Sequence, residues 1–194
     1  TPQYIVDYII ENTLEPEISR IQKESDSAQV IEKLLSLKIL DPAMGSGHFL
    51  VTATNYLARR ICEIEENENK KNYNERQRDV VRKCIYGVDL NALAVDLAKV
   101  ALWLETLSSD KPLSFLSSHL KHGNSLLGES IEGIYDKQTT MFEKTSRSKL
   151  KKTVRDYVGF ELLEDDTKSA VKAKIEKFNK INSKGSFYHQ LRGI

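Results

Sequence analysis

Apolar residues along this chain are grouped into short runs and longer amphipathic stretches that alternate. The short runs predict strands at Lys38–Asp41, Ile85–Leu90 and His119–Lys121, and the longer stretches predict helices at Ser46–Ile61 and Asn91–Leu107. Strands that alternate with helices form a parallel sheet joined by right-handed crossovers. The pattern therefore predicts an α/β fold.

The helix expected at Asn91–Leu107 has the clearest periodicity. Its large aliphatic residues recur at alternating steps of four and three, at Leu93, Leu97, Val100, Leu104 and Leu107. A single apolar stripe on an amphipathic helix usually faces the protein core. We therefore expect this stripe, and Trp103 beside it, to be buried.

Further helices are expected on both sides of the α/β part. Thr1–Leu14 predicts a helix capped by Thr1 with three isoleucines turned inward (Ile5, Ile9 and Ile10), and Ala28–Leu37 predicts a second helix. A weaker stripe predicts another helix at Ser169–Ile181. The highly charged stretch Glu63–Asp79 is interpreted as a solvated helix end followed by a loop.

These elements divide the chain into three segments. An N-terminal helical segment covers residues 1–37, an α/β core covers 38–128, and a basic loop with a helical part covers 129–194. The basic stretch Met141–Arg155 is compatible with contact to a DNA backbone, although a solvated loop is the simpler interpretation.

Composition places the chain among ordinary globular proteins. Its 194 residues are 40% hydrophobic and 29% charged, and the net charge of +1 gives no overall attraction to nucleic acid. The two cysteines are interpreted as reduced core thiols. No apolar run approaches the roughly 20 residues that span a bilayer, and no signal peptide is recognised, so a cytoplasmic location without membrane contact is expected.

The stretch ILDPAMGSGHFLV (Ile39–Val51) joins the first predicted strand to the next helix. Such a loop lies at the carboxyl edge of a parallel sheet, where glycines let the backbone approach a ligand with no Cβ in the way. Gly45 and Gly47 are placed for this role. A tight strand-to-helix turn without a ligand is the alternative interpretation.

Two aspartates end neighbouring strands of the predicted sheet. Asp89 follows the second strand, where a carboxylate is placed to accept both hydroxyls of a ribose. Its alternative role is to cap the helix Asn91–Leu107. Asp41 ends the first strand and could hold a cationic amine, or it could accept hydrogen bonds from the backbone of its own glycine turn.

The loop lacks the features of two common nucleotide-binding motifs. GSGHFL has no third glycine, and Asp89 follows Gly47 by far more than the about 20 residues of a dinucleotide fingerprint. No Gly-Lys-Ser/Thr follows the glycines, so a phosphate-binding loop is excluded. A ligand with a ribose and an amino-acid part but no phosphate fits better.

Four motifs resemble those of adenine-specific DNA methyltransferases, above all the large enzymes of restriction–modification and phage-defence systems. DPAMGSGHF is similar to their first motif, TPQYIV (Thr1–Val6) to the motif that precedes it, GVDLN (Gly87–Asn91) to their ribose-binding strand, and HGNSLLG (His122–Gly128) to the next motif. The resemblance implies a partial Rossmann-like fold, S-adenosylmethionine as cofactor and DNA as the partner of the full-length protein.

The resemblance also implies a role for each matching residue. Thr1 and Tyr4 would flank the methionine part of the cofactor, while Asp41, Ala43, Gly45 and Gly47 would form the loop beneath it. Asp89 would hold the ribose, Leu90 would pack on the adenine face and Asn124 would face the adenine amine. Many members have Asp where this chain has Asn124, and an amide oxygen can still accept a hydrogen bond.

The chain departs from the family in one respect. These enzymes use an Asn/Asp-Pro-Pro-Tyr/Phe motif to hold a flipped-out adenine, and the four prolines here include no Pro-Pro pair (Pro2, Pro16, Pro42 and Pro112). We therefore expect no catalytic residue in this chain and no activity from it alone. Without the strand that carries that motif, Lys38–Asp41 would be an open edge, which predicts that Ser169–Ile181 covers it or that two copies pair there.

Two alternative functions stay open. The first motifs occur widely, so the parent could methylate RNA, protein or a small molecule, or the chain could be a non-catalytic specificity or scaffold protein. No metal site is expected, because His119 and His122 on a strand would point to opposite faces. His48 is expected to be half-buried.

Overall fold

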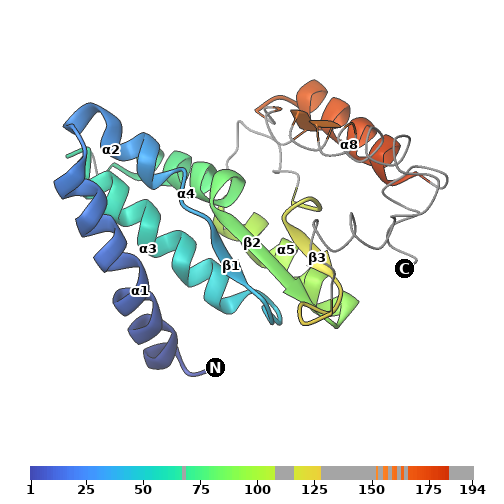
Figure 1. Ribbon diagram of the computed structural model, residues 1–194, viewed down its shortest axis with the longest axis horizontal. Helices are drawn as coiled ribbons and strands as arrows, with labels where there is room; N and C mark the ends of the chain where they lie inside the picture. The colour runs from blue at the N-terminus through green and yellow to red at the C-terminus, as the bar shows by residue number, and fades with distance from the viewer. Residues whose placement is uncertain are drawn as a thin grey trace, which may run out of the picture. The chain divides into compact units, whose positions relative to one another are not determined.

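The chain forms two compact units, Thr1–Ser125 and Leu126–Ile194, each described here by itself. The computed structural model describes residues 1–66, 69–107, 116–127, 152, 155–156, 159–160, 163 and 166–183. The first unit holds the sheet and the helices around it (Figure 1).

A parallel sheet of three strands lies at the centre of the first unit, in the order β1-β2-β3. The strands are β1 (Ile39–Asp41), β2 (Ile85–Asp89) and β3 (Leu120–His122). Ile39 lies opposite Ile85, and Asp89 lies opposite His122. The predicted α/β order with a parallel sheet is confirmed, and β1 has no second neighbouring strand among the described residues.

Three helices make the crossovers between these strands: α3 (His48–Ile64), α4 (Lys70–Lys83) and α5 (Ala92–Glu105). α3 and α5 contact each other and both contact β2, so they cover the same face of the sheet (Figure 1). The expected helices Ser46–Ile61 and Asn91–Leu107 are confirmed with slightly different ends.

The charged stretch Glu63–Asp79 was wrongly predicted to be a helix end and loop, because most of it belongs to α4. Asn69 caps this helix by accepting from the Asn72 backbone N–H at 2.8 Å. Arg76 pairs with Glu65 at 2.7 Å and with Asp79 at 2.9 Å. These ion pairs offset the charge of Arg76, and the helix packs against α3.

The N-terminal helix α1 (Gln3–Glu24) extends well beyond the predicted end at Leu14 and contains Pro16. Thr1 does not cap it, because the helix starts after Pro2 without a side-chain cap. Ile5 and Ile9 are exposed rather than inward, and the buried residues are Val6, Ile10, Ile18 and Ile21. Burial of the last two offsets the hydrogen bond that a proline removes. The helix α2 (Ser27–Leu34) follows.

The predicted stripe of α5 is not buried, which corrects the expectation from periodicity. Its five residues are 45–68% exposed, and the buried face consists of Val95, Ala98 and Leu102. Trp103 packs against the core as expected. The helix is apolar on both faces, and the face with the smaller residues packs against α3 and the sheet.

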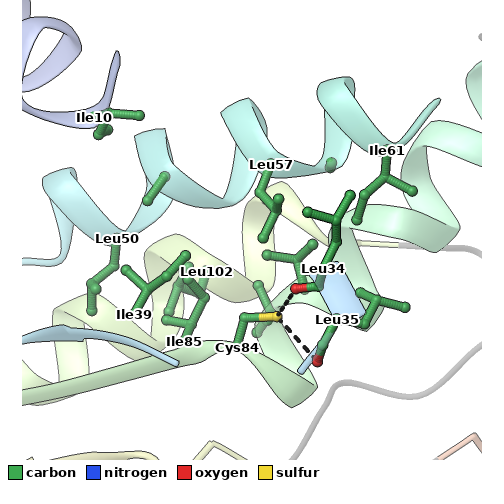
Figure 2. Close-up of a cluster of buried hydrophobic side chains, with 14 of the residues drawn as sticks. Ile10, Leu34, Leu35, Ile39, Leu50, Leu57, Ile61, Cys84, Ile85 and Leu102 are labelled. Atoms are coloured by element: carbon green, nitrogen blue, oxygen red, sulfur yellow. Dashed lines mark hydrogen bonds between the residues drawn. The ribbon is translucent and has the colours of Figure 1, made fainter. Parts of the chain in front are cut away.

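The hydrophobic core lies between the sheet and the helices that cover one of the sheet's faces. Leu50, Leu57 and Ile61 of α3 are fully buried with Ile85 of β2 and Leu102 of α5 (Figure 2). The Cys84 thiol donates to the Leu35 carbonyl at 3.5 Å, and burial raises its pKa to about 12. Cys62 is also a buried free thiol, so the expectation of reduced core cysteines is confirmed.

In the second unit, the described residues include one long helix, α8 (Lys168–Asn182), which confirms the helix predicted at Ser169–Ile181. Its Phe178 ring packs against Phe160, with centroids 5.5 Å apart. Lys174 is buried and donates to the Leu163 carbonyl at 3.0 Å. The basic stretch Met141–Arg155 lies almost entirely outside the described residues.

Candidate cofactor site

The loop after β1 is closed by its own backbone and by β2. Asp41 Oδ1 accepts from the Ala43 N–H at 3.0 Å, the Met44 N–H donates to the Val88 carbonyl at 3.0 Å, and the Gly47 N–H donates to the Met44 carbonyl at 2.9 Å. Asp41 therefore has the local turn-stabilising role that the sequence left open. The bond from Met44 to Val88 attaches the loop to β2, the strand that ends in Asp89.

The two loop glycines differ in what surrounds them. Gly45 (φ +53°) and Gly47 (φ +84°) both have left-handed backbones, which favour glycine. A Cβ on Gly47 would lie 2.9 Å from the Ala98 Cβ, whereas a Cβ on Gly45 would meet nothing within 4 Å. Gly47 thus lets α3 and α5 approach each other, while Gly45 faces open space.

The Asp89 carboxylate joins the loop to the second strand. Its Oδ2 accepts from the Gly45 N–H at 2.8 Å, and its Oδ1 accepts from the Asn91 N–H at 2.8 Å. These two backbone N–H groups hold the pKa of Asp89 below its ordinary value. Asn91, and not Asp89, caps α5 by accepting from the Leu93 N–H at 3.0 Å.

The end of β3 also contacts the backbone of Asp89 and Leu90, here called the Asp89–Leu90 corner. The Gly123 N–H donates to the Asp89 carbonyl at 3.0 Å, and His122 Nε2 lies 2.9 Å from the Leu90 carbonyl. Because a carbonyl only accepts, His122 Nε2 carries the hydrogen of this bond. His119 is used in the core instead, stacked on Tyr86 and bonded to the Ile85 carbonyl at 3.0 Å.

The first turns of α1 and α3 share a surface groove of about 600 Å³. Gln3 and Asp7 of α1 line it together with His48 and Thr52 of α3. Thr1 and Tyr4 flank Gln3 and are exposed. His48 is exposed rather than half-buried, which corrects that expectation.

The structure thus brings most of the predicted site residues to one edge of the sheet. Gly45 and Asp89 touch directly, and Leu90 is exposed next to them. Asn124 follows Gly123 at the end of β3 and is exposed. Thr1 and Tyr4 lie on the α1 terminus, which meets the start of α3 rather than Asp89.

The roles of three residues near the loop were not predicted from the sequence. Met44 is buried beneath the loop, where a Cβ on Gly87 would collide with its Sδ, and Ala98 is the residue that meets Gly47. His122, for which no metal role was expected, supports the Asp89–Leu90 corner. A small residue on α5 and a histidine at the end of β3 carry no local signal that predicts these contacts.

The protein is of the α/β class, and the carboxyl edge of its parallel sheet combines a glycine loop with an acidic strand end. The family described as MmeI, DNA-methyltransferase domain, matches residues 18–127, which is more than half of the chain. The chain belongs to this family of DNA-methyltransferase domains.

Individual relatives agree with the family. Type II restriction enzyme and methyltransferase RM.Eco57I of Escherichia coli is 29% identical over 148 residues, with 66% of this chain and 14% of that protein aligned. Adenine-specific methyltransferase PglX of Streptomyces coelicolor is 28% identical over 109 residues, covering 56% and 8%. RM.MjaORFECS2P of Methanocaldococcus jannaschii is 28% identical over 169 residues, covering 66% and 14%.

The chain therefore spans at most about one seventh of the length of these relatives, since the aligned share is 14% or less. No solved structure matches it. Among the helices of the described residues, none is long and apolar enough to cross a membrane.

Proposed function

We propose that this chain binds S-adenosylmethionine and forms the cofactor-binding part of a restriction–modification DNA methyltransferase that modifies the exocyclic amine of adenine. The observation that carries the proposal is the 2.8 Å hydrogen bond from the Gly45 N–H to Asp89 Oδ2. This bond joins the glycine loop to the acidic end of β2, and a nucleoside with an amino-acid part would contact both. The name of PglX, an adenine-specific methyltransferase, supports the choice of adenine.

The Asp89 carboxylate has capacity left for a ribose. A carboxylate offers about four acceptor positions on its two oxygens, and backbone N–H groups of Gly45 and Asn91 take two of them. The remaining positions could accept from the two ribose hydroxyls. Because the Asn91 and Gly45 N–H groups hold the pKa of Asp89 below its ordinary value, the carboxylate is ionised and acts as an acceptor at neutral pH.

Neighbouring residues fit the rest of the cofactor. The open space at Gly45 leaves room for a ligand against the backbone, and Leu90, 68% exposed, offers an apolar surface to an adenine ring. In this proposal Asn124 accepts from the adenine amine, and the loop residues Asp41 and Ala43 contact the ligand from below. Thr1 and Tyr4 are assigned to the methionine end, and Gly47 acts by letting α3 approach α5.

When bound, S-adenosylmethionine supplies an electrophilic methyl group on sulfur. The residues of this chain bind and orient the donor, whereas the base-binding motif and the DNA contacts belong to the full-length protein. The partial Rossmann-like topology expected from the sequence is part of this proposal. In such a sheet, the next strand would pair with the edge of β1 that faces away from β2. Methylation of RNA, protein or a small molecule is the alternative for the parent.

Isothermal titration calorimetry with S-adenosylmethionine tests the proposal. Asp89→Asn removes the charge and one acceptor oxygen, and we expect affinity to fall at least about tenfold, since bonds to charged groups are worth about 1.5–3 kcal/mol. Asp96→Asn on the exposed side of α5 is the matched control and should bind like the wild type. Equal affinity of wild type and Asp89→Asn, or no binding at millimolar cofactor, would overturn the assignment.

A further inference from the structure

A row of large apolar side chains runs along the outer face of α5. The α5 stripe consists of Leu93, Leu97, Val100 and Leu104 of the helix and Leu107 just beyond its end, which are 67%, 49%, 45%, 68% and 61% exposed. They lie opposite the buried face formed by Val95, Ala98 and Leu102. A continuous apolar row of this kind on a folded protein marks an interaction surface more often than single exposed leucines do.

The spacing of the stripe specifies the kind of surface that it fits. Steps of four, three, four and three residues repeat with a period of 3.5, which is the seam of two helices packed at a shallow angle with interlocking side chains. A strand or an irregular loop does not match this repeat over the about three helical turns from Leu93 to Leu104. The occupant is therefore expected to be an α-helix with the same repeat.

Within the described residues, α5 itself is the helix that carries such a seam. α1 exposes two pairs of apolar residues close to its start (Tyr4 with Tyr8, and Ile5 with Ile9), and α8 exposes Ile175 alone. Neither of these extends over about three turns, as the α5 stripe does. A second α5 is the matching partner that the described part of the chain offers.

We propose that the α5 stripe is a self-association surface on which α5 of a second copy packs antiparallel. A two-fold axis between Ala98 and Lys99 places Leu97 against the partner's Val100 and Leu93 against the partner's Leu104. The repeat is therefore self-complementary in this direction. This proposal differs from pairing through the β1 edge.

The flanks of the stripe are compatible with this pairing. On one side lie the small residues Ala94 and Ala101, which allow two helix backbones to approach to the 8–10 Å typical of packed helices. On the other side, Asp96 is paired with Lys99 at 3.1 Å, so no unpaired charge is buried. Under the two-fold axis, Asp96 lies level with the partner's Ala101, and like charges do not face each other.

The area predicts a weak dimer. A leucine or valine side chain carries on the order of 100 Å² of apolar surface, so the stripe contributes about 300 Å² from each copy at its exposed fractions. Apolar atoms make up a little over half of an ordinary interface, which gives a total near about 1,000 Å². That is the low end for a specific complex, so we expect a weak association that depends on protein concentration.

Sedimentation velocity of the 194-residue chain over a concentration series tests the proposal. Wild type should shift from monomer to dimer, and Leu97→Glu should weaken association at least about tenfold by placing a charge against the partner's Val100. The double variant Leu97→Glu/Val100→Lys should restore association, because each introduced glutamate then faces an introduced lysine. Circular dichroism should be unchanged, since both sites are exposed.

Leu40→Glu is the matched control, because Leu40 is exposed on β1 and lies outside the stripe. It should dimerise like wild type. Three results would overturn the proposal: a monomer at all concentrations, loss of the dimer in Leu40→Glu with Leu97→Glu unaffected, or failure of the double variant to restore a dimer that Leu97→Glu abolishes.

Discussion

Both the geometry of the loop and the packing of α5 depend on the absence of a side chain at Gly47. Its φ of +84° disfavours any Cβ, and an added Cβ would lie 2.9 Å from the Ala98 Cβ and 3.1 Å from the Ala98 Cα. Gly47→Ala therefore introduces backbone strain and steric overlap together. Gly123→Ala is a matched control, because its Cβ would meet nothing within 4 Å.

The expected change in the free energy of unfolding combines two destabilising effects and one stabilising effect. A left-handed backbone costs a residue with a Cβ roughly 1–2 kcal/mol, and overpacking costs roughly 1–3 kcal/mol. Reduced freedom of the unfolded chain returns about 0.4–1 kcal/mol. We expect Gly47→Ala to lower the free energy of unfolding by about 1–4 kcal/mol, a large share of the about 5–15 kcal/mol of an ordinary domain.

Urea unfolding followed by tryptophan fluorescence measures this loss, because the single tryptophan, Trp103, lies on α5 and packs against the core of the first unit. Ala98→Gly in the same background removes the closest contact, so a double-mutant cycle should give a coupling of about 1 kcal/mol. A Gly47→Ala midpoint equal to that of Gly123→Ala, or a coupling of zero, would refute the reasoning.

Three further predictions concern the loop, its support and the thiols. Gly45→Ala places a methyl group in the open space proposed for the cofactor, so calorimetry should show a larger loss of S-adenosylmethionine affinity than Gly123→Ala; equal affinities would show that no ligand lies there. His122→Ala should weaken cofactor binding severalfold while His122→Gln, which keeps an N–H donor, largely restores it; an effect on the unfolding midpoint alone would reduce His122 to a structural role. Cys62 and Cys84 are buried and the pKa of Cys84 is raised to about 12, so a thiol reagent should label the native chain slowly at neutral pH and both cysteines in urea; rapid labelling of the native chain would contradict the burial.

The sequence predicted which residues meet at the carboxyl edge of the sheet better than it predicted which helix face is buried. The contact between Gly45 and Asp89 follows from topology, because the carboxyl ends of adjacent parallel strands share one edge of the sheet. The roles assigned to the site residues stay predictions, as does the pairing of two copies through the β1 edge.

Periodicity identifies residues that share a helix face, but it does not identify the face that is buried. In α5 the large residues form the outer stripe, whereas Ala98 is buried because only a small side chain fits beside Gly47. In α4 the density of charged residues concealed a helix that is held by packing against α3 and the sheet. These outcomes depend on contacts between distant parts of the chain, which a local pattern does not contain.

The central claim is that the glycine loop and the end of β2 hold one methyl donor between them. Amide NMR spectra recorded during a titration with S-adenosylmethionine test it most directly, since the Gly45 and Asn91 N–H groups both donate to the Asp89 carboxylate. We predict that the largest shifts occur at Gly45, Leu90, Asn91 and Asn124. Saturable shifts elsewhere in the first unit, with these four amides unchanged, would contradict it.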